Sequence, residues 1–409
     1  MGRIEPVRPR VSVAAVLLLL ALAACGGGGG SSGGGGSSGG DVVGAPGPNV
    51  QPIVVDPGPA QNYANGAFTS VTVCVPGTST CQTISGVLVD TGSSGLRLLS
   101  SVLTLPLPPQ SDSGGAPILE CNQFEDSYQW GPVVLADVKI AGEQAASVPI
   151  QAIGTSAFGA PEACTQAGLP PQETVASLGA NGVLGVGLFR QDCGPACALT
   201  GSQNPGLYYS CPSAGCGPTA VGVNQQVLNP VWLFAKDNNG VILQLPSVPA
   251  AGSLTLNGSM IFGIGTQSNN GLGSAKVYTV DDVGYFTTAY QGNSYPRSFV
   301  DSGSNGMYFL DSATTGLTLC RDTADFYCPP SPVGFTATNR GANGTSAAVD
   351  FTIANADVLF NTPNAAMVNL GGPNPGAFDW GLPFFFGRTV YTGLEGQGTP
   401  GGVGPYFAY

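Results

Sequence analysis

The feature that most limits the folds open to this chain is a short segment that occurs twice, once in each half of the sequence. Residues 87–96 read VLVDTGSSGL, and residues 297–306 read RSFVDSGSNG. In each copy an apolar run leads into Asp, a small hydroxyl residue, Gly and Ser. A single copy is ordinary turn chemistry, because Asp caps a turn and Gly supplies positive φ. Two matched copies, each after an apolar run, are not expected by chance, and they single out Asp90 and Asp301.

The remainder of the chain has the pattern of short strands joined by turns. The sequence contains 63 glycines and 34 prolines, and short runs of Val, Ile, Thr, Phe and Tyr separate them. This punctuation favours strands over helices. We therefore predict an all-β fold, with strands over 68–75, 81–89, 133–140, 148–153, 241–245 and 259–264, then over 284–290, 297–300, 349–353, 358–360 and 384–386.

The amino-acid composition excludes several classes of catalytic mechanism and binding partner. The chain has no histidine, which excludes Ser-His-Asp and Cys-His hydrolysis, His-ligated zinc and acid–base chemistry by imidazole. The formal net charge is −12, and without a basic patch to displace counterions a nucleic-acid partner is not expected. Any catalysis is therefore sought first among the carboxylates.

The N-terminus has the pattern of an export signal. Arg3, Arg8 and Arg10 precede an apolar run over 11–21 that is too short to span a membrane. The run ends in Leu-Ala-Ala-Cys at 22–25, which resembles a bacterial lipobox in which Cys25 is acylated. The alternative is a plain signal peptide with a chance cysteine. We predict a lipoprotein signal peptide over 1–25.

The segment after the signal has a composition typical of a tether. Residues 26–40 are only Gly and Ser, and a Gly/Pro-rich stretch continues to 60; such segments are flexible spacers. We predict a tether over 26–60 that lifts a folded domain off a membrane. The resemblance to lipoproteins without Asp after the cysteine implies an exported protein anchored in the bacterial cell envelope, at the outer membrane or the cell surface.

The cysteine count fits export. Of the 11 cysteines, all but Cys25 could form disulfides in an oxidising compartment. Sequence does not establish connectivity, but close spacings suit staples across hairpins or loops. The pairs proposed on this ground are Cys74 with Cys81, Cys193 with Cys197, Cys211 with Cys216 and Cys320 with Cys328, which leaves Cys121 with Cys164. A cysteine-bound metal is the weaker alternative, because no C-x-x-C motif occurs.

The two acidic loops together with their flanking segments resemble the pepsin-like aspartic peptidases. In that family a segment of two hydrophobic residues and a glycine crosses each loop. Residues 181–188 (NGVLGVGL) are similar to the first such segment, and residues 379–385 (DWGLPFF) to the second. Residues 258–263 (GSMIFG) resemble the strand that closes the first lobe, and Cys320 and Cys328 lie where a second-lobe disulfide is common. The resemblance covers 65–409 and implies a bilobal fold, with an N-terminal lobe over 61–265 and a C-terminal lobe over 266–409.

The resemblance also implies a reaction. Two carboxylates within hydrogen-bonding reach cannot both ionise, so Asp90 and Asp301 would share one proton and activate a water. Thr91 and Ser302 would donate hydroxyls across the lobe interface, and Ser93 and Ser304 would bond the outer carboxylate oxygens. Glycine lets backbone approach the carboxylates closely. The supporting residues are thus Thr91, Gly92, Ser93, Ser302, Gly303 and Ser304, and the implied mechanism needs no metal or organic cofactor.

The chain departs from the family in two places. A hairpin flap with a tyrosine and nearby glycines usually covers the cleft, but residues 121–131 (CNQFEDSYQWG) have no glycine before Gly131. Phe124 stands where the tyrosine is expected, and Tyr128 is close enough to replace it, so both are candidates for contact with substrate. Arg97 stands where a tryptophan is common, and it would lower the pKa values of the dyad if its side chain turned inward.

These observations predict a monomeric, envelope-anchored aspartic endopeptidase whose partner is an extended peptide or protein substrate, with the lipid as its only membrane contact. A second hypothesis is a protein with the same fold but little or no catalysis, whose cleft binds a peptide or glycan. The unusual flap favours this hypothesis. A third is a secreted β-sandwich or adhesin. In that case Asp90 and Asp301 would lie far apart.

Overall fold

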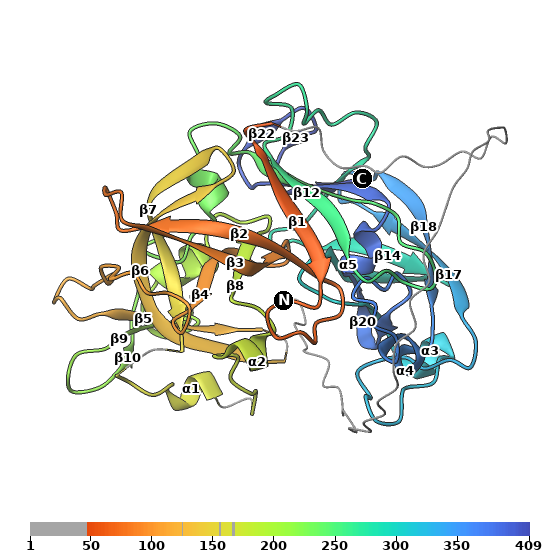
Figure 1. The fold of residues 1–409 in the computed structure, drawn as a ribbon, viewed down its shortest axis with the longest axis horizontal. Helices are drawn as coiled ribbons and strands as arrows, with labels where there is room; N and C mark the ends of the chain where they lie inside the picture. The colour runs from red at the N-terminus through yellow and green to blue at the C-terminus, as the bar shows by residue number, and fades with distance from the viewer. Residues whose placement is uncertain (1–46, 125, 155–156, 166–167) are drawn as a thin grey trace, which may run out of the picture.

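The computed structural model describes residues 47–124, 126–154, 157–165 and 168–409 of the chain. The predicted signal peptide, Cys25 and most of the predicted tether lie outside these residues. The first half of the chain builds one lobe and the second half another, side by side, with strands of both halves in the middle (Figure 1). None of the helices in the described part has the length and apolar character needed to span a bilayer.

The strands of the first half lie between residues 50 and 262. They are β1 (Val50–Asp56), β2 (Gly66–Cys74), β3 (Cys81–Asp90), β4 (Ser94–Leu99), β5 (Ile118–Gln123), β6 (Tyr128–Ile140), β7 (Glu143–Ile153), β8 (Gly182–Val186), β9 (Tyr208–Ser210), β10 (Gly217–Pro218), β11 (Gly240–Leu245) and β12 (Leu256–Phe262). Short helices interrupt them: α1 (Glu162–Thr165), α2 (Val175–Leu178), η1 (Gly194–Ala198), η2 (Gly201–Gln203) and η3 (Pro230–Leu233).

The second half is also built mainly of strands. They are β13 (Val277–Thr279), β14 (Phe286–Tyr290), β15 (Asn293–Val300), β16 (Met307–Leu310), β17 (Val333–Arg340), β18 (Ser346–Ile353), β19 (Gly371–Gly372), β20 (Asn374–Trp380), β21 (Arg388–Gly393), β22 (Gly398–Thr399), β23 (Gly402–Val403) and β24 (Tyr406–Ala408). The helices are α3 (Ser312–Thr315), α4 (Ala356–Phe360) and α5 (Leu382–Phe385). The predicted all-β, bilobal architecture is confirmed.

The two lobes repeat one strand arrangement around their acidic loops. In the first half, β8 pairs parallel with β3 and antiparallel with β4, so it lies between the strands that flank the loop at Asp90. In the second half, β20 pairs parallel with β15 and antiparallel with β16, on either side of the loop at Asp301. Each acidic loop is therefore the connection between two strands that a third strand separates, which matches the crossing segments expected at 181–188 and 379–385.

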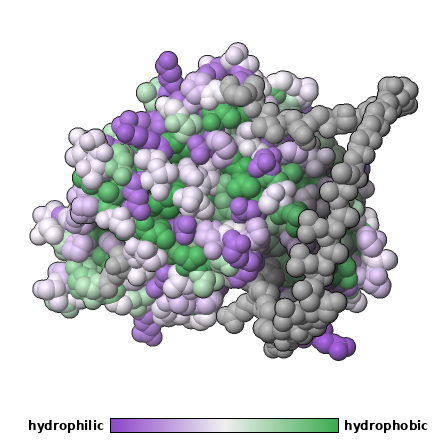
Figure 2. All heavy atoms as spheres, viewed as in Figure 1, coloured by the Kyte–Doolittle hydropathy of each residue, from purple (hydrophilic) through white to green (hydrophobic). Residues whose placement is uncertain are grey.

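A continuous sheet joins the lobes. In the described residues its order runs β1-β12-β11-β21-β24-β13 at one end, so that strands from both halves of the chain are hydrogen-bonded neighbours. Apolar residues of both halves form the largest buried cluster, among them Val89, Leu243, Phe262, Phe378 and Trp380. On the face seen in Figure 2, hydrophobic and hydrophilic residues are interspersed over the surface.

Three expectations about local structure are wrong. Residues 50–56, assigned to the tether, form β1, because alternate residues such as Ile53 and Val55 are buried against β12 and β2. Residues 358–360 belong to helix α4, which Asn355 caps by accepting a hydrogen bond from the Val358 N–H. Residues 384–385 lie in helix α5, which has a proline in its first turn, a position compatible with a helix start.

The proposed disulfides are confirmed. Within the described residues, the bonded pairs are Cys74–Cys81, Cys121–Cys164, Cys193–Cys197, Cys211–Cys216 and Cys320–Cys328. Four of them close short loops, whereas Cys121–Cys164 ties β5 to helix α1 across 43 residues. Cross-links of this kind stabilise mainly by restricting the unfolded chain.

Candidate active site

Asp90 is the last residue of β3, and its own loop holds its carboxylate. The Gly92 and Ser93 N–H groups donate to Oδ1 at 2.7 and 3.2 Å, and the Ser93 hydroxyl donates to Oδ2 at 2.5 Å. Asp90 is only 2% exposed. These three donors replace the water that a buried carboxylate loses.

Asp301 follows directly after β15 and has an equivalent environment. The Gly303 N–H donates to its Oδ1 at 2.7 Å, and the Ser304 hydroxyl donates to Oδ2 at 3.0 Å. Asp301 is fully buried. Predicted supporting residues therefore surround both carboxylates, in the same order along the chain.

A reciprocal set of hydrogen bonds holds the two loops against each other. The Thr91 hydroxyl accepts from the Ser302 N–H at 2.9 Å, and the Ser302 hydroxyl accepts from the Thr91 N–H at 3.1 Å. The Ser302 hydroxyl also donates to the Val89 carbonyl at 2.8 Å. The residues expected to bridge the lobes thus do bridge them, and the bridge includes the backbone of both loops.

The glycines of the two loops place each carboxyl group against the opposite lobe. A methyl group built on Gly92 would lie 2.5 Å from Cγ of Asp301, and one on Gly303 would lie 2.7 Å from Cγ of Asp90. Any side chain at either position would push the lobes apart, so glycine is required here. Asp90 and Asp301 come together between the lobes, which rules out the β-sandwich or adhesin hypothesis.

The electrostatics of this pair favour a proton shared between the two carboxyl groups. Burial raises the pKa of Asp301 well above the ordinary value of an aspartate, and the carboxyl groups of Asp90 and Asp379 raise it further. Asp90 also hydrogen-bonds to Asp301, which adds to the shift. Because two carboxylates this close do not both ionise readily, the pair holds a proton under conditions in which an exposed aspartate has lost it.

A third carboxyl group, Asp379, is connected to the pair and was missed by the sequence analysis. It lies near the end of β20, is 3% exposed, and its Oδ2 lies 2.6 Å from the Ser304 hydroxyl. That hydroxyl also contacts Asp301 at 3.0 Å, yet it has only one proton to donate. The Ser304 hydroxyl therefore links the carboxyl group of Asp379 to that of Asp301. The only sequence hint was its place at the start of 379–385, next to the crossing glycine.

We expect Asp379→Asn to lower the pKa of Asp301, since the amide has the carboxylate's shape without its charge. A raised folded-state pKa makes stability fall as the pH rises through it, because the unfolded chain releases the proton more readily. The variant should therefore lose less free energy of unfolding than the wild type between about pH 4 and 8. Urea titrations at several pH values measure this. If the free energy of unfolding changed equally with pH in the two proteins, Asp379 would not be coupled to Asp301.

A pocket lies beside the acidic loops. Its volume is about 510 Å³, and its lining includes Thr91 and Gly92 from the first loop and Phe299 from the strand before Asp301. Leu188 and Tyr285 contribute further apolar surface. A mainly apolar pocket with polar groups at one side is typical of small-molecule or side-chain binding sites.

The two flap candidates lie on the expected hairpin, but both are packed into the lobe. Phe124 follows β5 and is 5% exposed in an apolar cluster with Leu88 and Val183. Tyr128 begins β6 and is 8% exposed in a different cluster, with Trp130 and Tyr209 among its members. Neither is among the residues that line the pocket. Their side chains therefore contribute to the stability of the hairpin in this structure.

The hairpin itself is attached on both sides. Strand β5 pairs with β9, and the Cys121–Cys164 disulfide bonds it to helix α1. On the other side, the Tyr128 N–H donates to the Pro170 carbonyl at 3.1 Å, and the Gln172 N–H donates to the Tyr128 carbonyl at 2.8 Å. These attachments hold the hairpin in place.

Arg97 does not turn toward the acidic pair. Its guanidinium contacts Glu120 at 2.7 Å and Asp192 at 3.1 Å, and it donates to the Ser94 carbonyl at 2.9 Å. The Tyr208 hydroxyl donates to Asp192. Burial raises the pKa of Asp192 well above its ordinary value, and the nearby Glu120 raises it further. The charge of Arg97 is therefore committed to this buried network, and the condition for lowering the dyad pKa values is not met.

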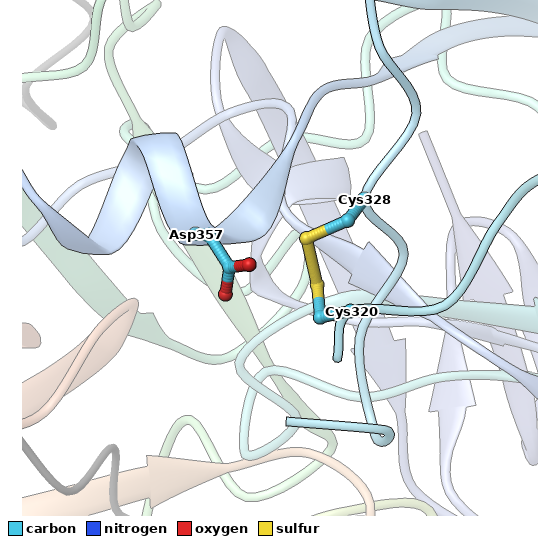
Figure 3. A group of neighbouring side chains, drawn as sticks. All are labelled: Cys320, Cys328 and Asp357. Atoms are coloured by element: carbon cyan, nitrogen blue, oxygen red, sulfur yellow. A yellow bond between two sulfur atoms is a disulfide. The ribbon is translucent and has the colours of Figure 1, made fainter. Parts of the chain in front are cut away.

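One group of potential metal ligands occurs in the described part of the chain: Cys320, Cys328 and Asp357 (Figure 3). Its two sulfurs are bonded to each other. A disulfide has no thiolate to offer, and thiolate is the form in which cysteine binds metals. The Asp357 carboxylate beside the disulfide is then a single isolated ligand, so this group is not a metal site.

Comparison with known proteins found a matching family model and solved structures of similar fold. The model of a family described as "Protein of unknown function (DUF3443)" matches residues 45–409. No curated protein matches. The crystal structure of an aspartic proteinase from Irpex lacteus is similar, with 15% sequence identity and a TM-score of 0.49, over 88% of this chain and 96% of that chain.

Proposed function

The chain belongs to the DUF3443 family, and we propose that it is an aspartic peptidase in which Asp90 and Asp301 activate a water to hydrolyse peptide bonds. The observation that carries the proposal is the contact between the loops. Each carboxyl group lies against the glycine of the other loop, with its own set of hydrogen-bond donors. Such a pair shares one proton and can act as general acid and general base together.

The proposed reaction uses the two carboxyls in different roles. Asp301, whose pKa is raised by burial and by Asp90, carries the proton and donates it to the carbonyl oxygen of the scissile bond. Asp90 accepts a proton from the water as the water attacks the carbonyl carbon. The resulting diol then collapses: Asp90 passes its proton to the leaving amine as the C–N bond breaks, and Asp301 takes a proton back from a hydroxyl of the diol. The products are a carboxylic acid and an amine, and the dyad again holds one proton on Asp301. Ser93 and Ser304 orient the carboxyls, and Thr91 with Ser302 keeps the two loops in register.

We propose that the enzyme acts outside the cytoplasm and is lipid-anchored at Cys25. The five disulfides support an oxidising compartment, because such bonds persist mainly there. Cell fractionation tests the anchor: the wild type should pellet with membranes, and a Cys25→Ala variant should be released. A soluble wild type would contradict the anchor without affecting the proposed chemistry.

The test of the activity is cleavage of a diverse peptide library from about pH 3 to 7, with and without pepstatin. We expect cleavage that depends on pH and is blocked by the inhibitor, because the dyad must carry a single proton. Mass spectrometry of the products identifies the bonds. Absence of cleavage by folded, disulfide-bonded protein would reject the activity.

The burial of Phe124 and Tyr128 favours one second candidate. A hairpin held on both sides closes over substrate less readily than a free flap, and closure serves to exclude water. The same fold would then bind a peptide or glycan in its cleft with little turnover. Binding of library peptides without cleavage would support this candidate over the peptidase.

A further inference from the structure

The pocket beside the acidic loops, which we call the dyad pocket, has a wall that touches the acidic pair. Gly92 lines the pocket, and a methyl group built on Gly92 would lie 2.5 Å from Cγ of Asp301. Phe299 and Val300 line it as well, from the strand that leads into Asp301. An extended peptide advances about 3.3 Å per residue. A peptide bound at the dyad therefore has a residue at this pocket close to the scissile bond.

Both lobes contribute apolar walls to the dyad pocket. Leu188 and Phe189 come from the segment after β8, and Tyr285 and Phe299 come from the second half of the chain. The lobes meet there, since a methyl group built on Gly284 would lie 3.2 Å from side-chain carbons of Leu188 and Phe189. The ring centroids of Tyr285 and Phe299 lie 5.9 Å apart. Such walls suit the apolar stem of a long side chain.

The charged residues of the dyad pocket are all acidic. They are Asp192, Asp282 and Glu395, and within the part of the chain that the structure describes no lysine or arginine lines the pocket. Asp192 is already paired with Arg97. The other two carboxylates have no cationic partner among the described residues, where both ion pairs involve Arg97. The pocket thus offers two uncompensated negative charges beside apolar walls.

Glu395 is fixed to the wall of the pocket by its backbone and by one carboxylate oxygen. Its N–H donates to the Leu188 carbonyl at 2.9 Å, and its Oε1 accepts from the Arg190 N–H at 2.8 Å. The guanidinium of Arg190 lies elsewhere, because its Nη2 donates to Asn224 at 3.0 Å and its Cζ lies 4.8 Å from the ring centroid of Trp232. The charge of Glu395 is therefore free to meet a ligand.

Asp282 lies at the opening of the pocket, since it lines the pocket and is exposed. An ordered turn holds it. Asp281 accepts hydrogen bonds from the Val283 N–H at 3.0 Å and from the Tyr285 N–H at 2.8 Å, and its own N–H donates to the Tyr285 carbonyl at 2.9 Å. The turn therefore uses the carboxylate of Asp281 and leaves that of Asp282 for the pocket.

We propose that the dyad pocket selects a basic side chain, so that the substrate carries arginine or lysine at one fixed position within about two residues of the scissile bond. The stem of this side chain packs on the apolar walls, and its cationic head meets Glu395 and Asp282. A guanidinium also stacks on aromatic rings such as Tyr285 and Phe299. This inference rests on the proposed peptidase function and names its substrate class. Asp282 and Glu395 are then specificity-determining residues.

The test varies one position at a time in a peptide that the enzyme cleaves. Arginine, lysine, norleucine or glutamate is placed at each position around the scissile bond, and kcat/KM is measured at about pH 6, where exposed carboxylates are ionised. Norleucine supplies the apolar stem without the charge. At one position we expect arginine and lysine to raise kcat/KM at least about 10-fold over norleucine, the combined effect of two partly exposed ion pairs. Glutamate should be the slowest there.

Charge changes in the pocket give the structural test. Asp282→Lys should lower the ratio of arginine-peptide to glutamate-peptide cleavage at that position at least about 10-fold, because an attractive charge becomes a repulsive one. Glu395→Gln keeps the shape of the side chain and should lower the ratio of arginine-peptide to norleucine-peptide cleavage about 3-fold.

The matched control for Asp282→Lys is Asp322→Lys, at an exposed aspartate that does not line the pocket. It changes the net charge by the same amount and should leave both ratios unchanged. The control is needed because a chain of net charge −12 attracts cationic peptides from a distance. If Asp322→Lys lowered the ratios as much as Asp282→Lys, the preference would come from the net charge and the role of the pocket would be overturned.

The remaining outcomes separate this inference from the peptidase. Equal cleavage of the arginine, lysine and norleucine peptides at every position would overturn the inference and leave the peptidase intact. No cleavage of any peptide would reject the peptidase, and binding then tests the pocket. Tighter binding of arginine peptides than of their norleucine counterparts, lost in Asp282→Lys, would support the pocket's preference. Equal Kd values would overturn it.

Discussion

Replacing Asp90 or Asp301 by asparagine should reduce peptide cleavage by at least about 10³-fold, since general acid–base catalysis contributes a factor of this order. Asparagine has the shape of aspartate and can still accept the Gly92 or Gly303 N–H through its oxygen. It can neither take a proton from water nor share one with its neighbour. Rates of peptide cleavage by the single and double variants measure the loss.

A stability measurement distinguishes a variant that has lost catalysis from one that no longer folds. The folded-state pKa of Asp301 is raised, so its stability contribution is present at low pH and is lost as the pH rises through that pKa. Asp301→Asn should therefore be at least as stable as the wild type at neutral pH, while being inactive. Asp350→Asn, at an exposed position on β18, is the matched control and should retain full activity. Persistent cleavage by the double variant would locate the catalytic groups elsewhere.

Replacing Arg97 by methionine should lower the free energy of unfolding by about 3–5 kcal/mol at neutral pH, the usual cost of breaking a buried ion pair. Arg97 is 1% exposed and is the shared cation of Glu120 and Asp192. Without it two buried carboxylates face each other with no compensating charge. Urea unfolding with the disulfides intact measures the difference from the wild type.

The pH dependence of this loss has a definite sign. The pKa of Asp192 is raised well above its ordinary value by burial and by Glu120, so this group favours the folded state at low pH. The cost of Arg97→Met should accordingly shrink as the pH falls and Asp192 becomes protonated. Arg340→Met, at an exposed arginine on β17, is the control and should change stability by less than about 1 kcal/mol. A small effect of Arg97→Met at all pH values would show that the network contributes little.

Much of the active-site prediction came from local chemistry. The Asp-hydroxyl-Gly-Ser pattern after an apolar run specifies its own turn, and that turn supplies the donors that hold Asp90 and Asp301. Two copies in one chain pointed to a two-lobed arrangement. The close cysteine pairs are likewise local, because chain spacing alone brings such residues within bonding distance. These features need little information from distant parts of the chain.

The secondary-structure predictions were wrong where a local sequence pattern is compatible with two kinds of structure. A short apolar run such as 358–360 suits a buried strand or a buried helix equally well, and the cap at Asn355 decided for the helix. Residues 50–56 resembled tether because Gly and Pro surround them. Their pairing with β12, some 200 residues along the chain, made them a strand.

The sequence by itself determined which side chains were candidates for the site: the chain has no histidine and has two matched acidic loops, so paired carboxylates remained, and local turn geometry holds each of them. Only the tertiary structure decided what surrounds the pair. Asp379 reaches Ser304 through the pairing of β20 with β15 and β16, Arg97 meets Glu120 and Asp192 across separate strands, and Asn65 bonds Met367 across 302 residues. Such contacts depend on how whole strands and lobes pack, and no single stretch of sequence encodes that packing.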